Sequence, residues 1–391
     1  MAARYRVGII ACGTISRAHL RAYRALPNVE VVAGADVSEE VRQQWLTEHG
    51  LPRMYAAAEE LLDKERPDVV SICTWPTIRP QMVELACAYG VKGILAEKPM
   101  AVDLAGCDRM IAAAERAGTL LVVGHQRRFH NRYRKARELL DSGAIGDLVQ
   151  LTGYDAADLL SNGSHTVDLI RYLVHDAPAQ WVIGQIDMRD TGRRNSHLGF
   201  QQWEETHTRY GHHIESGVFA LVQFGGSPPA AARSAGGAEA RELPAPAQEG
   251  PRATIEGGVV GRRRRPGGGG WGMTVYGSEG VIEVAGDQPA EGQPWVRARV
   301  EGQSEWLVPE VEGNDAFRAE AEALFHVLEH GGTHPLDGRS ARAGHEIMMA
   351  IFESARRRAR IDLPLTVQDY PLDAMVAAGE LVPQGAPAGH A

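Results

Sequence analysis

Short apolar runs alternate with amphipathic stretches along the first 125 residues of the chain. The apolar runs are rich in Val, Ile, Leu and Ala, a composition typical of strands that are buried on both faces. They cover residues 6–10, 29–35, 68–73, 93–96 and 120–123. Apolar positions at helical spacing predict helices between them, over residues 16–25, 38–49, 80–89 and 104–117. This alternation favours right-handed βαβ units and a doubly wound parallel sheet.

The pattern changes after Gly143, where strands follow one another with fewer helices between them. Strand character is found over residues 181–188, 217–224, 273–276, 280–284, 295–300 and 305–308. Helices are predicted over residues 164–174, 315–329 and 340–358. We therefore expect an α/β Rossmann domain over residues 1–125, followed by an α+β domain over residues 126–383 with an open, mostly antiparallel sheet. The helices within residues 315–360 are expected to pack back onto the fold.

Two segments show neither the alternation typical of strands nor the spacing of apolar residues typical of helices. Residues 226–272 are rich in Gly, Ala and Pro and contain four consecutive arginines, residues 262–265, followed by Pro266 and four glycines. This composition predicts a long mobile loop, because it offers too little apolar area to order itself. The arginine run could contact a polyanion, but a solvated loop tip explains it as well. Residues 384–391 are expected to form a disordered tail.

Composition and charge narrow the function classes. A length of 391 residues fits two domains, and 44% hydrophobic with 23% charged residues is ordinary for a globular protein. A net charge of -9 argues against nucleic acid or an anionic membrane as partner. The four cysteines form no CxxC pair, which fits a reducing compartment. With neither a signal-peptide pattern nor a membrane-spanning apolar stretch, we expect a cytoplasmic protein.

The turn after the first strand has the composition of a phosphate-binding turn. Of the usual G-x-G-x-x-G pattern it keeps only the central glycine, Gly13. A glycine here lets the backbone approach a pyrophosphate at the N-terminus of the following helix. We predict that this turn binds a dinucleotide through Cys12, Gly13, Thr14 and Ile15.

An acidic residue, Asp36, ends the second predicted strand. A carboxylate at this place can accept hydrogen bonds from the adenosine ribose and would repel a 2′-phosphate. The next residues, Val37 and Ser38, supply no cation for such a phosphate. The pattern therefore favours NAD over NADP. The alternative is that Asp36 only caps the helix that follows.

The fourth predicted strand ends in Glu97-Lys98-Pro99. Proline favours an extended backbone at Lys98, which would project the lysine from the carboxyl edge of the sheet. Ligands of open α/β sheets bind at that edge. Lys98 could hold a substrate hydroxyl or share in its deprotonation. A surface lysine without a function is the alternative.

Several motifs together resemble the glucose–fructose oxidoreductase / inositol dehydrogenase (Gfo/Idh/MocA) family. The resemblance spans nearly the whole chain except residues 226–272 and the tail. Its motifs, in chain order, are Gly13 in its turn, Glu97-Lys98-Pro99, Gly124-His125-Gln126-Arg127-Arg128-Phe129, Ser142-Gly143-Ala144-Ile145-Gly146, Gly163-Ser164-His165-Thr166-Val167-Asp168-Leu169-Ile170-Arg171-Tyr172 and Gly277-Ser278-Glu279-Gly280.

The resemblance implies an N-terminal Rossmann domain and a C-terminal domain whose open sheet forms homodimers or homotetramers. It implies a small-molecule substrate, a sugar, cyclitol or related polyol, and oxidation or reduction of one of its carbons with NAD or NADP. Lys98 would contact substrate and nicotinamide, and Asp168 would orient the substrate. The cofactor contacts that it implies beyond the turn and Asp36 are Thr74, Trp75, Glu97, Lys98 and Gln126. Trp75 could equally be a core residue.

Two residues are candidates for the acid/base. Many family members carry a histidine four residues after the helix aspartate, where this chain has Tyr172. Asp168 and Tyr172 are spaced i, i+4 and so lie on one helical face. Tyrosine is a weak base, with an ordinary pKa of about 10, which a neighbouring ammonium would lower. His165 lies near the same face and is the second candidate. Helix packing for Tyr172 and a structural role for His165 are the alternatives.

Other polar residues give weaker signals. Arg79 stands where family members commonly have a histidine and could favour an anionic substituent such as a uronate. His207, His212 and His213 cluster in the second domain without a carboxylate placed to complete a zinc site, so no metal is expected. One of these histidines could hydrogen-bond a sugar hydroxyl.

These observations predict an NAD-dependent oxidoreductase that transfers a hydride between nicotinamide C4 and a carbinol carbon. The prediction requires Lys98 and Tyr172 to meet near the nicotinamide ring. Two other functions use the same motifs. An NAD-dependent glycosidase would oxidise, eliminate and reduce again without net turnover of the cofactor, and a non-catalytic sensor would only bind NAD.

Overall fold

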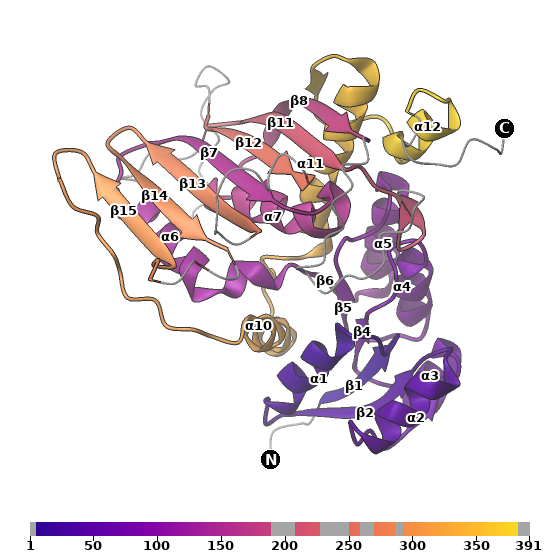
Figure 1. Cartoon of the computed structure of the whole chain (residues 1–391). Helices are drawn as coiled ribbons and strands as arrows, with labels where there is room; N and C mark the ends of the chain where they lie inside the picture. The colour runs from indigo at the N-terminus through magenta and orange to yellow at the C-terminus, as the bar shows by residue number, and fades with distance from the viewer. Residues whose placement is uncertain are drawn as a thin grey trace. The chain divides into compact units, whose positions relative to one another are not determined.

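The computed structural model describes residues 5–188, 208–226, 250–258, 270–286, 289 and 292–381. The chain forms two compact units. The first contains Met1–Phe129 with Asn314–Arg342, and the second contains His130–Gly313 with Ala343–Ala391. Figure 1 follows the chain through both units by colour. The segment Asn314–Arg342, which the sequence places after the first domain, thus belongs to the first unit, and the proposed domain boundary at residues 125 and 126 stays a prediction.

The first unit is built on a six-stranded parallel sheet, which confirms the predicted doubly wound Rossmann fold. Its strand order is β3 (Met54–Tyr55), β2 (Val29–Ala35), β1 (Tyr5–Ile10), β4 (Val69–Ile72), β5 (Gly93–Glu97) and β6 (Leu120–Gly124). Its helices are α1 (Ser16–Arg24), α2 (Glu39–Thr47), α3 (Ala58–Glu65), α4 (Arg79–Ala88), α5 (Leu104–Ala117), η1 (Gln126–Phe129) and α10 (Ala316–His330). The short strand β3 and the helix α3 were not predicted.

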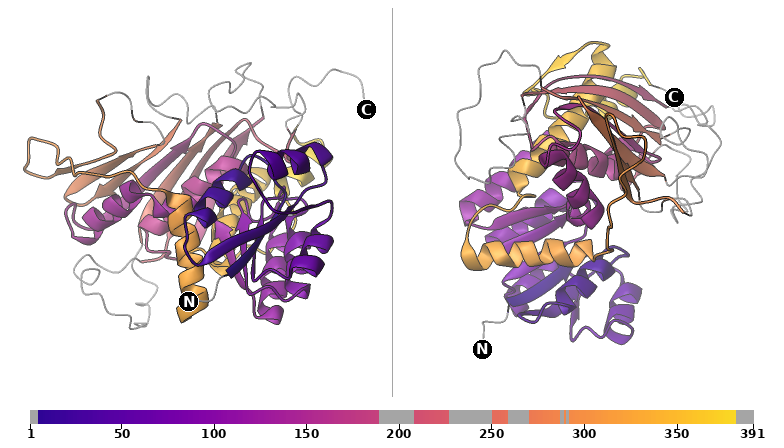
Figure 2. Two further views of the ribbon diagram at one scale, coloured as in Figure 1. Left: turned by 90° about the horizontal axis from the view of Figure 1, so that it is seen from below. Right: turned by 90° about the vertical axis from the view of Figure 1, so that its left-hand side faces the viewer.

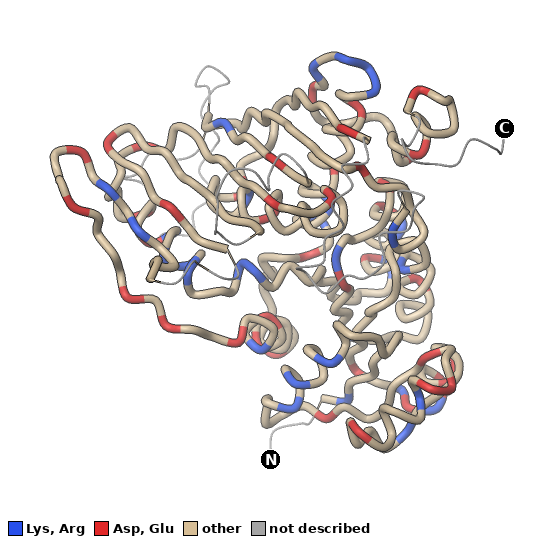
Figure 3. Tube along the Cα trace, viewed as in Figure 1, with Lys and Arg blue, Asp and Glu red and all other residues tan. Residues whose placement is uncertain are grey.

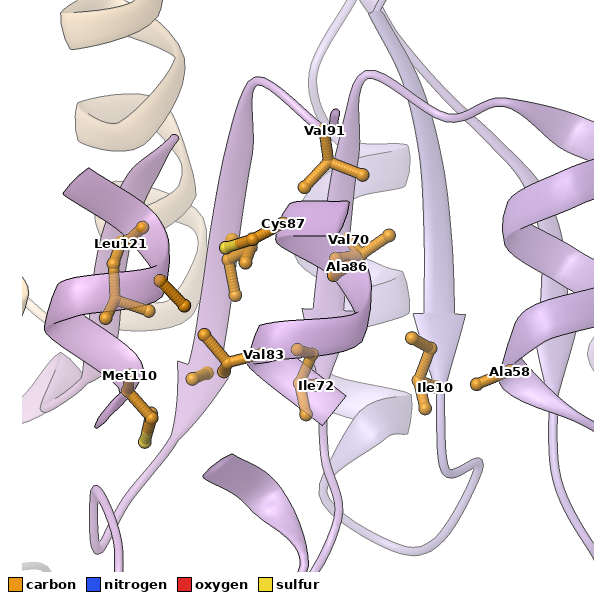
Figure 4. Packing of buried hydrophobic residues seen from close by; sticks show 14 of the residues in the cluster. Ile10, Ala58, Val70, Ile72, Val83, Ala86, Cys87, Val91, Met110 and Leu121 are labelled. Carbon is orange, nitrogen blue, oxygen red and sulfur yellow. The ribbon is translucent and has the colours of Figure 1, made fainter. Parts of the chain in front are cut away.

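Helices cover both faces of this sheet because its strands bury side chains on both sides. On one face, Val70 and Ile72 of β4 pack against Val83 of α4, together with side chains from α3 and α5 (Figure 4). On the other face, Val69 belongs to a cluster that contains Phe325 of α10. Consecutive residues of one strand therefore contact different helices, which explains the uninterrupted apolar runs in the sequence.

The second unit is built on an eight-stranded sheet in which only β7 and β12 pair in parallel, which confirms the predicted mostly antiparallel sheet. Its order is β15 (Val296–Val300), β14 (Gly280–Ala285), β13 (Trp271–Gly277), β7 (Leu148–Asp155), β12 (Arg252–Gly257), β11 (Gly217–Phe224), β8 (Ala179–Asp187) and β16 (Ile361–Asp362). A two-stranded ribbon pairs β9 (Thr208–Arg209) with β10 (His212–His213). The helices are α6 (Asn131–Asp141), η2 (Leu159–Gly163), α7 (Ser164–Leu173), α12 (Pro371–Ala377) and, from Ala343 onward, α11 (Gly338–Arg357).

One face of this sheet is apolar and covered by helices (Figures 1 and 2). Directly paired residues form a buried row across seven strands, Val182, Val222, Ala253, Leu151, Val275, Ile282 and Ala298. The opposite face mixes polar and apolar residues. On it Ile183, Phe219 and Tyr276 are exposed by 47%, 47% and 41%. The sheet is therefore amphipathic, as expected for a sheet with one face on the core.

The predicted loop over residues 226–272 is wrong in part. Arg252–Gly257 form β12, an interior strand of the sheet, and β13 already begins at Trp271. Ala253 and Ile255 are buried, but these two apolar residues between Gly- and Pro-rich flanks are too short a signal to identify a strand. The remainder, residues 227–249 and 259–269 with the arginine run, lies outside the described residues, as does the predicted tail.

Further differences concern the second unit. The central strand β7 and the helix α6 were not predicted. The predicted strand at residues 305–308 is wrong, since only Leu307 forms a bridge, with Ala298, and Leu307 and Val308 are exposed.

Among the described residues, no helix combines the length and the apolar composition needed to cross a membrane.

Helix α7 packs against β7 at Gly153, and this contact generates a stability prediction. A Cβ atom at Gly153 would lie 2.6 Å from Cγ2 of Thr166 and 3.1 Å from Cδ1 of Ile170. Overpacking of this kind costs about 1–3 kcal/mol. We expect Gly153→Ala to lower the free energy of unfolding by that amount, measured by chemical denaturation. Gly313→Ala is the control, because no atom of the described part of the chain lies within 4 Å of a Cβ at Gly313. Equal stability of the two variants would contradict the prediction.

Candidate active site

The predicted cofactor residues of the first unit meet at the carboxyl edge of its parallel sheet. Ile10 of β1 pairs with Ala35 of β2 and with Ile72 of β4, and Ile72 pairs with Ala96 of β5. This register brings the segments that follow these strands to one edge of the sheet. The edge therefore carries the turn after β1 together with Asp36, Thr74 and Lys98. The strand order reverses its direction at β1, which is where doubly wound sheets bind ligands.

The turn between β1 and α1 fits a pyrophosphate group. No atom of the described residues lies within 4 Å of a Cβ built on Gly13, so the backbone there is open to a close neighbour. No side chain caps the N-terminus of α1, and its first turn holds no acidic residue. The arginines of α1 appear as blue segments in Figure 3. Uncapped N–H groups and the helix dipole together favour an anion at this position.

Asp36 ties the end of β2 to this turn. One carboxylate oxygen accepts a hydrogen bond from the backbone N–H of Cys12 at 2.8 Å, and the other accepts from the N–H of Ser38 at 2.9 Å. Ser38, not Asp36, is the N-cap of α2, because its side chain accepts from the N–H of Val41. The capping alternative for Asp36 is therefore wrong. The half-buried carboxylate keeps lone pairs for ribose hydroxyls.

A cation near Asp36 is held by other groups. The Arg42 guanidinium donates to the carbonyls of Asp36 and Val37, at 2.8 and 3.0 Å, and pairs with the Glu39 carboxylate. Hydrogen bonds from Gln43 and Arg42 lower the pKa of Glu39. A 2′-phosphate beside Asp36 would thus meet two carboxylates and an arginine that is already engaged, an arrangement that favours NAD.

Thr74 offers an unused polar group at the same edge. Its hydroxyl is buried and has no hydrogen-bond partner among the described residues. A buried hydroxyl of this kind is available to hydrogen-bond a ligand. The Arg79 guanidinium donates to the carbonyls of Thr74 and Pro99 and is itself buried. Arg79 therefore holds the ends of β4 and β5, and the structure gives no support to its predicted contact with an anionic substituent.

A buried polar network holds Lys98. The Nε2 atom of His19 lies 2.9 Å from one oxygen of Glu97, and the other oxygen accepts from the backbone N–H of Lys98 at 3.1 Å. Ser71 links this pair to Tyr23, with its hydroxyl 2.8 Å from both Nδ1 of His19 and the hydroxyl of Tyr23. Burial alone would raise the pKa of Glu97, but the hydrogen bond and charge of His19 outweigh it and hold that pKa below its usual range. A role for His19 was not predicted from the sequence.

The remaining predicted cofactor residues also lie after these strands. Trp75 is 58% exposed, so it is not a core residue, and Gln126 is half-buried at the start of η1. Lys98 is half-buried, and its peptide bond to Pro99 is cis. Burial and the nearby Asp36 raise the pKa of the Cys12 thiol, so Cys12 contributes through its backbone rather than as a nucleophile.

Helix α7 of the second unit carries the predicted acid/base residues. His165 and Asp168 are buried, and Tyr172 is half-buried. The guanidinium carbon of Arg137 on α6 lies 5.0 Å from the centre of the Tyr172 ring, and Arg137 also donates to the Tyr172 carbonyl. These contacts favour the packing role for Tyr172.

Two charged residues that were not predicted from the sequence form an ion pair close to the turn η2, which leads into α7. Asp158 is buried and pairs at 2.8 Å with Arg209, which is partly buried. Of the histidine cluster, His212 is buried, His213 contacts Asp373 at 2.7 Å, and His207 lies outside the described residues. No group of three metal-binding side chains occurs among the described residues.

Comparisons with known proteins agree with this geometry. Residues 5–125 match a family model described as an oxidoreductase family with an NAD-binding Rossmann fold. The chain is 30% identical over 238 residues to inositol 2-dehydrogenase of Ralstonia nicotianae, covering 56% of this chain and 68% of that protein. It is 33% identical over 175 residues to D-apiose dehydrogenase of Paraburkholderia graminis, covering 44% of this chain and 46% of that protein.

A solved structure has the same fold. The WlbA dehydrogenase from Bordetella pertussis, in complex with NADH and UDP-GlcNAcA, superposes with a TM-score of 0.68 at 20% sequence identity. The match covers 93% of this chain and 99% of the other. At this identity the likeness concerns the fold alone.

The position of Asp36 generates a prediction about cofactor binding. Asp36→Ser removes a charged acceptor worth about 1.5–3 kcal/mol, which corresponds to a rise in the Kd for NAD of about 10- to 100-fold. It should also narrow the preference for NAD over NADP, because the repulsive charge is lost. Titration with NADH and NADPH measures both effects. Glu40→Gln is the control, since Glu40 is an exposed acid in the first turn of α2; an unchanged Kd for NAD in Asp36→Ser would contradict the assignment.

Proposed function

This chain belongs to the Gfo/Idh/MocA family of NAD-binding oxidoreductases, and we propose that it oxidises a secondary alcohol of a sugar, cyclitol or related polyol. It is an NAD-dependent dehydrogenase that acts on CH–OH groups. The observation that carries the proposal is Lys98, held by the buried Glu97–His19 pair at the same sheet edge as the phosphate-binding turn. The relatives named after inositol and D-apiose support a polyhydroxylated substrate.

The first unit would hold the cofactor with groups that have few other partners. The turn at Gly13 and the N-terminus of α1 take the pyrophosphate, and Asp36 takes the adenosine ribose. The Thr74 hydroxyl can donate to the nicotinamide half. Bound NAD supplies the hydride acceptor. Binding and orientation by these residues provide much of the rate, because positioning replaces the entropy loss of a bimolecular encounter.

Lys98 and α7 would handle the proton of the reacting hydroxyl. The Lys98 ammonium donates a hydrogen bond to the substrate oxygen and stabilises negative charge as the proton leaves. The Asp168 carboxylate orients the substrate by accepting hydrogen bonds from the hydroxyls of the substrate. We prefer His165 to Tyr172 as the base, because a neutral imidazole carries a lone pair that can accept the proton, and the Tyr172 ring is packed against Arg137.

The open face of the second unit's sheet supports association of identical copies. Ile183 and Phe219 are exposed there on the adjacent strands β8 and β11, and Tyr276 is exposed on β13; exposed apolar groups of this kind mark interaction surfaces. We propose a homodimer or homotetramer through this face. A monomeric mass in solution at micromolar concentration would contradict the proposal.

Turnover of a panel of polyols and aldoses tests the proposed function. With NAD and one member of the panel, we expect NADH to accumulate in step with loss of the alcohol, and more slowly with NADP. An NAD-dependent glycosidase of this fold would cleave glycosides without accumulation of NADH. Glycoside cleavage without NADH, or NAD binding without turnover of any member, would contradict the proposal.

Removal of the Lys98 amine gives the second prediction for this site. We expect Lys98→Met to lower kcat by about 10²- to 10⁴-fold, the usual contribution of a proton-transfer group. The Kd for NAD should change little, because the turn and Asp36 are untouched. Lys64→Met is the control, since Lys64 is an exposed lysine of α3 whose ammonium pairs with Glu60 and lies over the Tyr55 ring. Wild-type kcat in Lys98→Met would refute the role of the amine.

A further inference from the structure

Two buried carboxyl groups hold the start of the π-helical turn η2 in the second unit. Asp158 is the N-cap of η2, and its Oδ1 accepts from the N–H of Ser161 at 2.7 Å. Glu215, in the link between β10 and β11, accepts from the N–H of Leu159 at 2.5 Å. Asp158 and Glu215 are almost completely inaccessible to solvent. Each acid therefore fixes a backbone N–H of the same turn.

The two acids differ in their further partners. The second oxygen of Asp158 receives the Arg209 guanidinium at 2.8 Å. The second oxygen of Glu215 is buried and has no hydrogen-bond partner among the described residues. Two neighbouring buried carboxyls cannot both ionise without strong repulsion. The cation places the negative charge on Asp158 and leaves the proton to Glu215.

Titration behaviour agrees with this division. Burial and the charge of Asp158 raise the pKa of Glu215 to about 8. For Asp158 burial acts in the same direction, but Arg209 and the hydrogen bonds from Ser161 prevail and keep its pKa below the usual range.

Among the described residues, the other titratable groups that face the pair are His212 and Tyr370, with His213 and Asp373 next to them. His212 of β10 is buried, and burial lowers its pKa, so it is neutral at neutral pH. Tyr370, the N-cap of α12, is also buried, and its pKa is raised by burial and then by the charges of Glu215, Asp158 and Asp373. His213 is held by Asp373.

The turn that these acids hold leads directly into α7. Gly163, the last residue of η2, is the N-cap of α7, so the first helical turn contains His165 and Asp168 follows one turn later. Turns of this π-helical kind occur frequently at functional sites. The backbone that Asp158 and Glu215 fix is therefore the backbone that places both residues.

We propose that protonated Glu215 is a positioning residue, which together with Asp158 fixes η2 and so places His165 and Asp168 for the reaction. Loss of its proton would set a second buried negative charge against Asp158, and the repulsion between the two carboxylates would displace the groups that hold η2. The dehydrogenase should therefore lose activity at alkaline pH through Glu215. The inference rests on the proposed function in its assignment of His165 and Asp168.

Glu215→Gln tests the proposal, because glutamine keeps an acceptor for the N–H of Leu159 and cannot ionise. We expect kcat/KM of the wild type to fall about tenfold per pH unit above about pH 8, and this fall to be absent or displaced upward in Glu215→Gln. Glu301→Gln, at an exposed acid of the same unit, should keep the wild-type profile. The same alkaline fall in Glu215→Gln as in the wild type would overturn the proposal.

Unfolding measurements separate this inference from the proposed function. Between the ordinary carboxyl pKa and about 8, folded Glu215 keeps a proton that the unfolded chain has lost. The free energy of unfolding of the wild type should therefore decrease as pH rises through this window, relative to Glu215→Gln, whether or not a substrate is known. Parallel pH dependence of the two proteins would overturn the inference, whereas absence of turnover with the expected difference in stability would contradict only the proposed function.

A second variant covers the case in which Glu215→Gln does not fold. Asp158→Asn removes the charge that keeps the proton on Glu215 and takes the carboxylate partner away from the nearby Arg209 cation. Both effects favour ionised Glu215, so the alkaline fall in kcat/KM, or the corresponding change in stability, should move to lower pH. A fall at the wild-type pH, or at higher pH, would overturn the proposal.

Discussion

The hydrogen bond between His19 and Glu97 is the constraint on which the candidate cofactor site depends. His19 lies on α1, whose N-terminus forms the phosphate-binding turn, and Glu97 precedes Lys98 at the end of β5. One buried contact thus ties the candidate phosphate-binding turn to Lys98, the proposed catalytic lysine. A buried carboxylate that loses its partner costs about 3–5 kcal/mol, so the two elements cannot separate cheaply.

The second unit uses the same physical device at α7. There a buried acid with a cation, Asp158 with Arg209, fixes the entry to the helix that carries His165. The two arrangements differ in charge. The described contacts of the Glu97 carboxylate, on both of its oxygens, include no second acid. Asp158 has the buried acid Glu215 beside it, so one of these two carboxyls holds a proton. In both units, buried acids therefore fix the backbone through hydrogen bonds from N–H groups, and their shifted pKa values follow from the same contacts.

Much of the first unit could be predicted from its sequence, because strands buried on both faces, such as Val69–Ile72, leave uninterrupted apolar runs. Strand β12 could not, since its neighbours on the sheet are far apart in the chain and its own apolar residues are few. Asp36 was predictable from its place after a strand. His19 was not, because its partner Glu97 is 78 residues away and no local pattern marks the pair.

Cofactor preference follows from more than the acid that the sequence identifies. Asp36 repels a 2′-phosphate, but loss of that charge alone supplies no cation to replace it. Arg42 stays on the carbonyls of Asp36 and Val37 and on the Glu39 carboxylate, all contacts that do not need the Asp36 side chain. Affinity for a 2′-phosphate therefore requires a second change that releases Arg42, so a single substitution at Asp36 narrows the preference for NAD but does not reverse it.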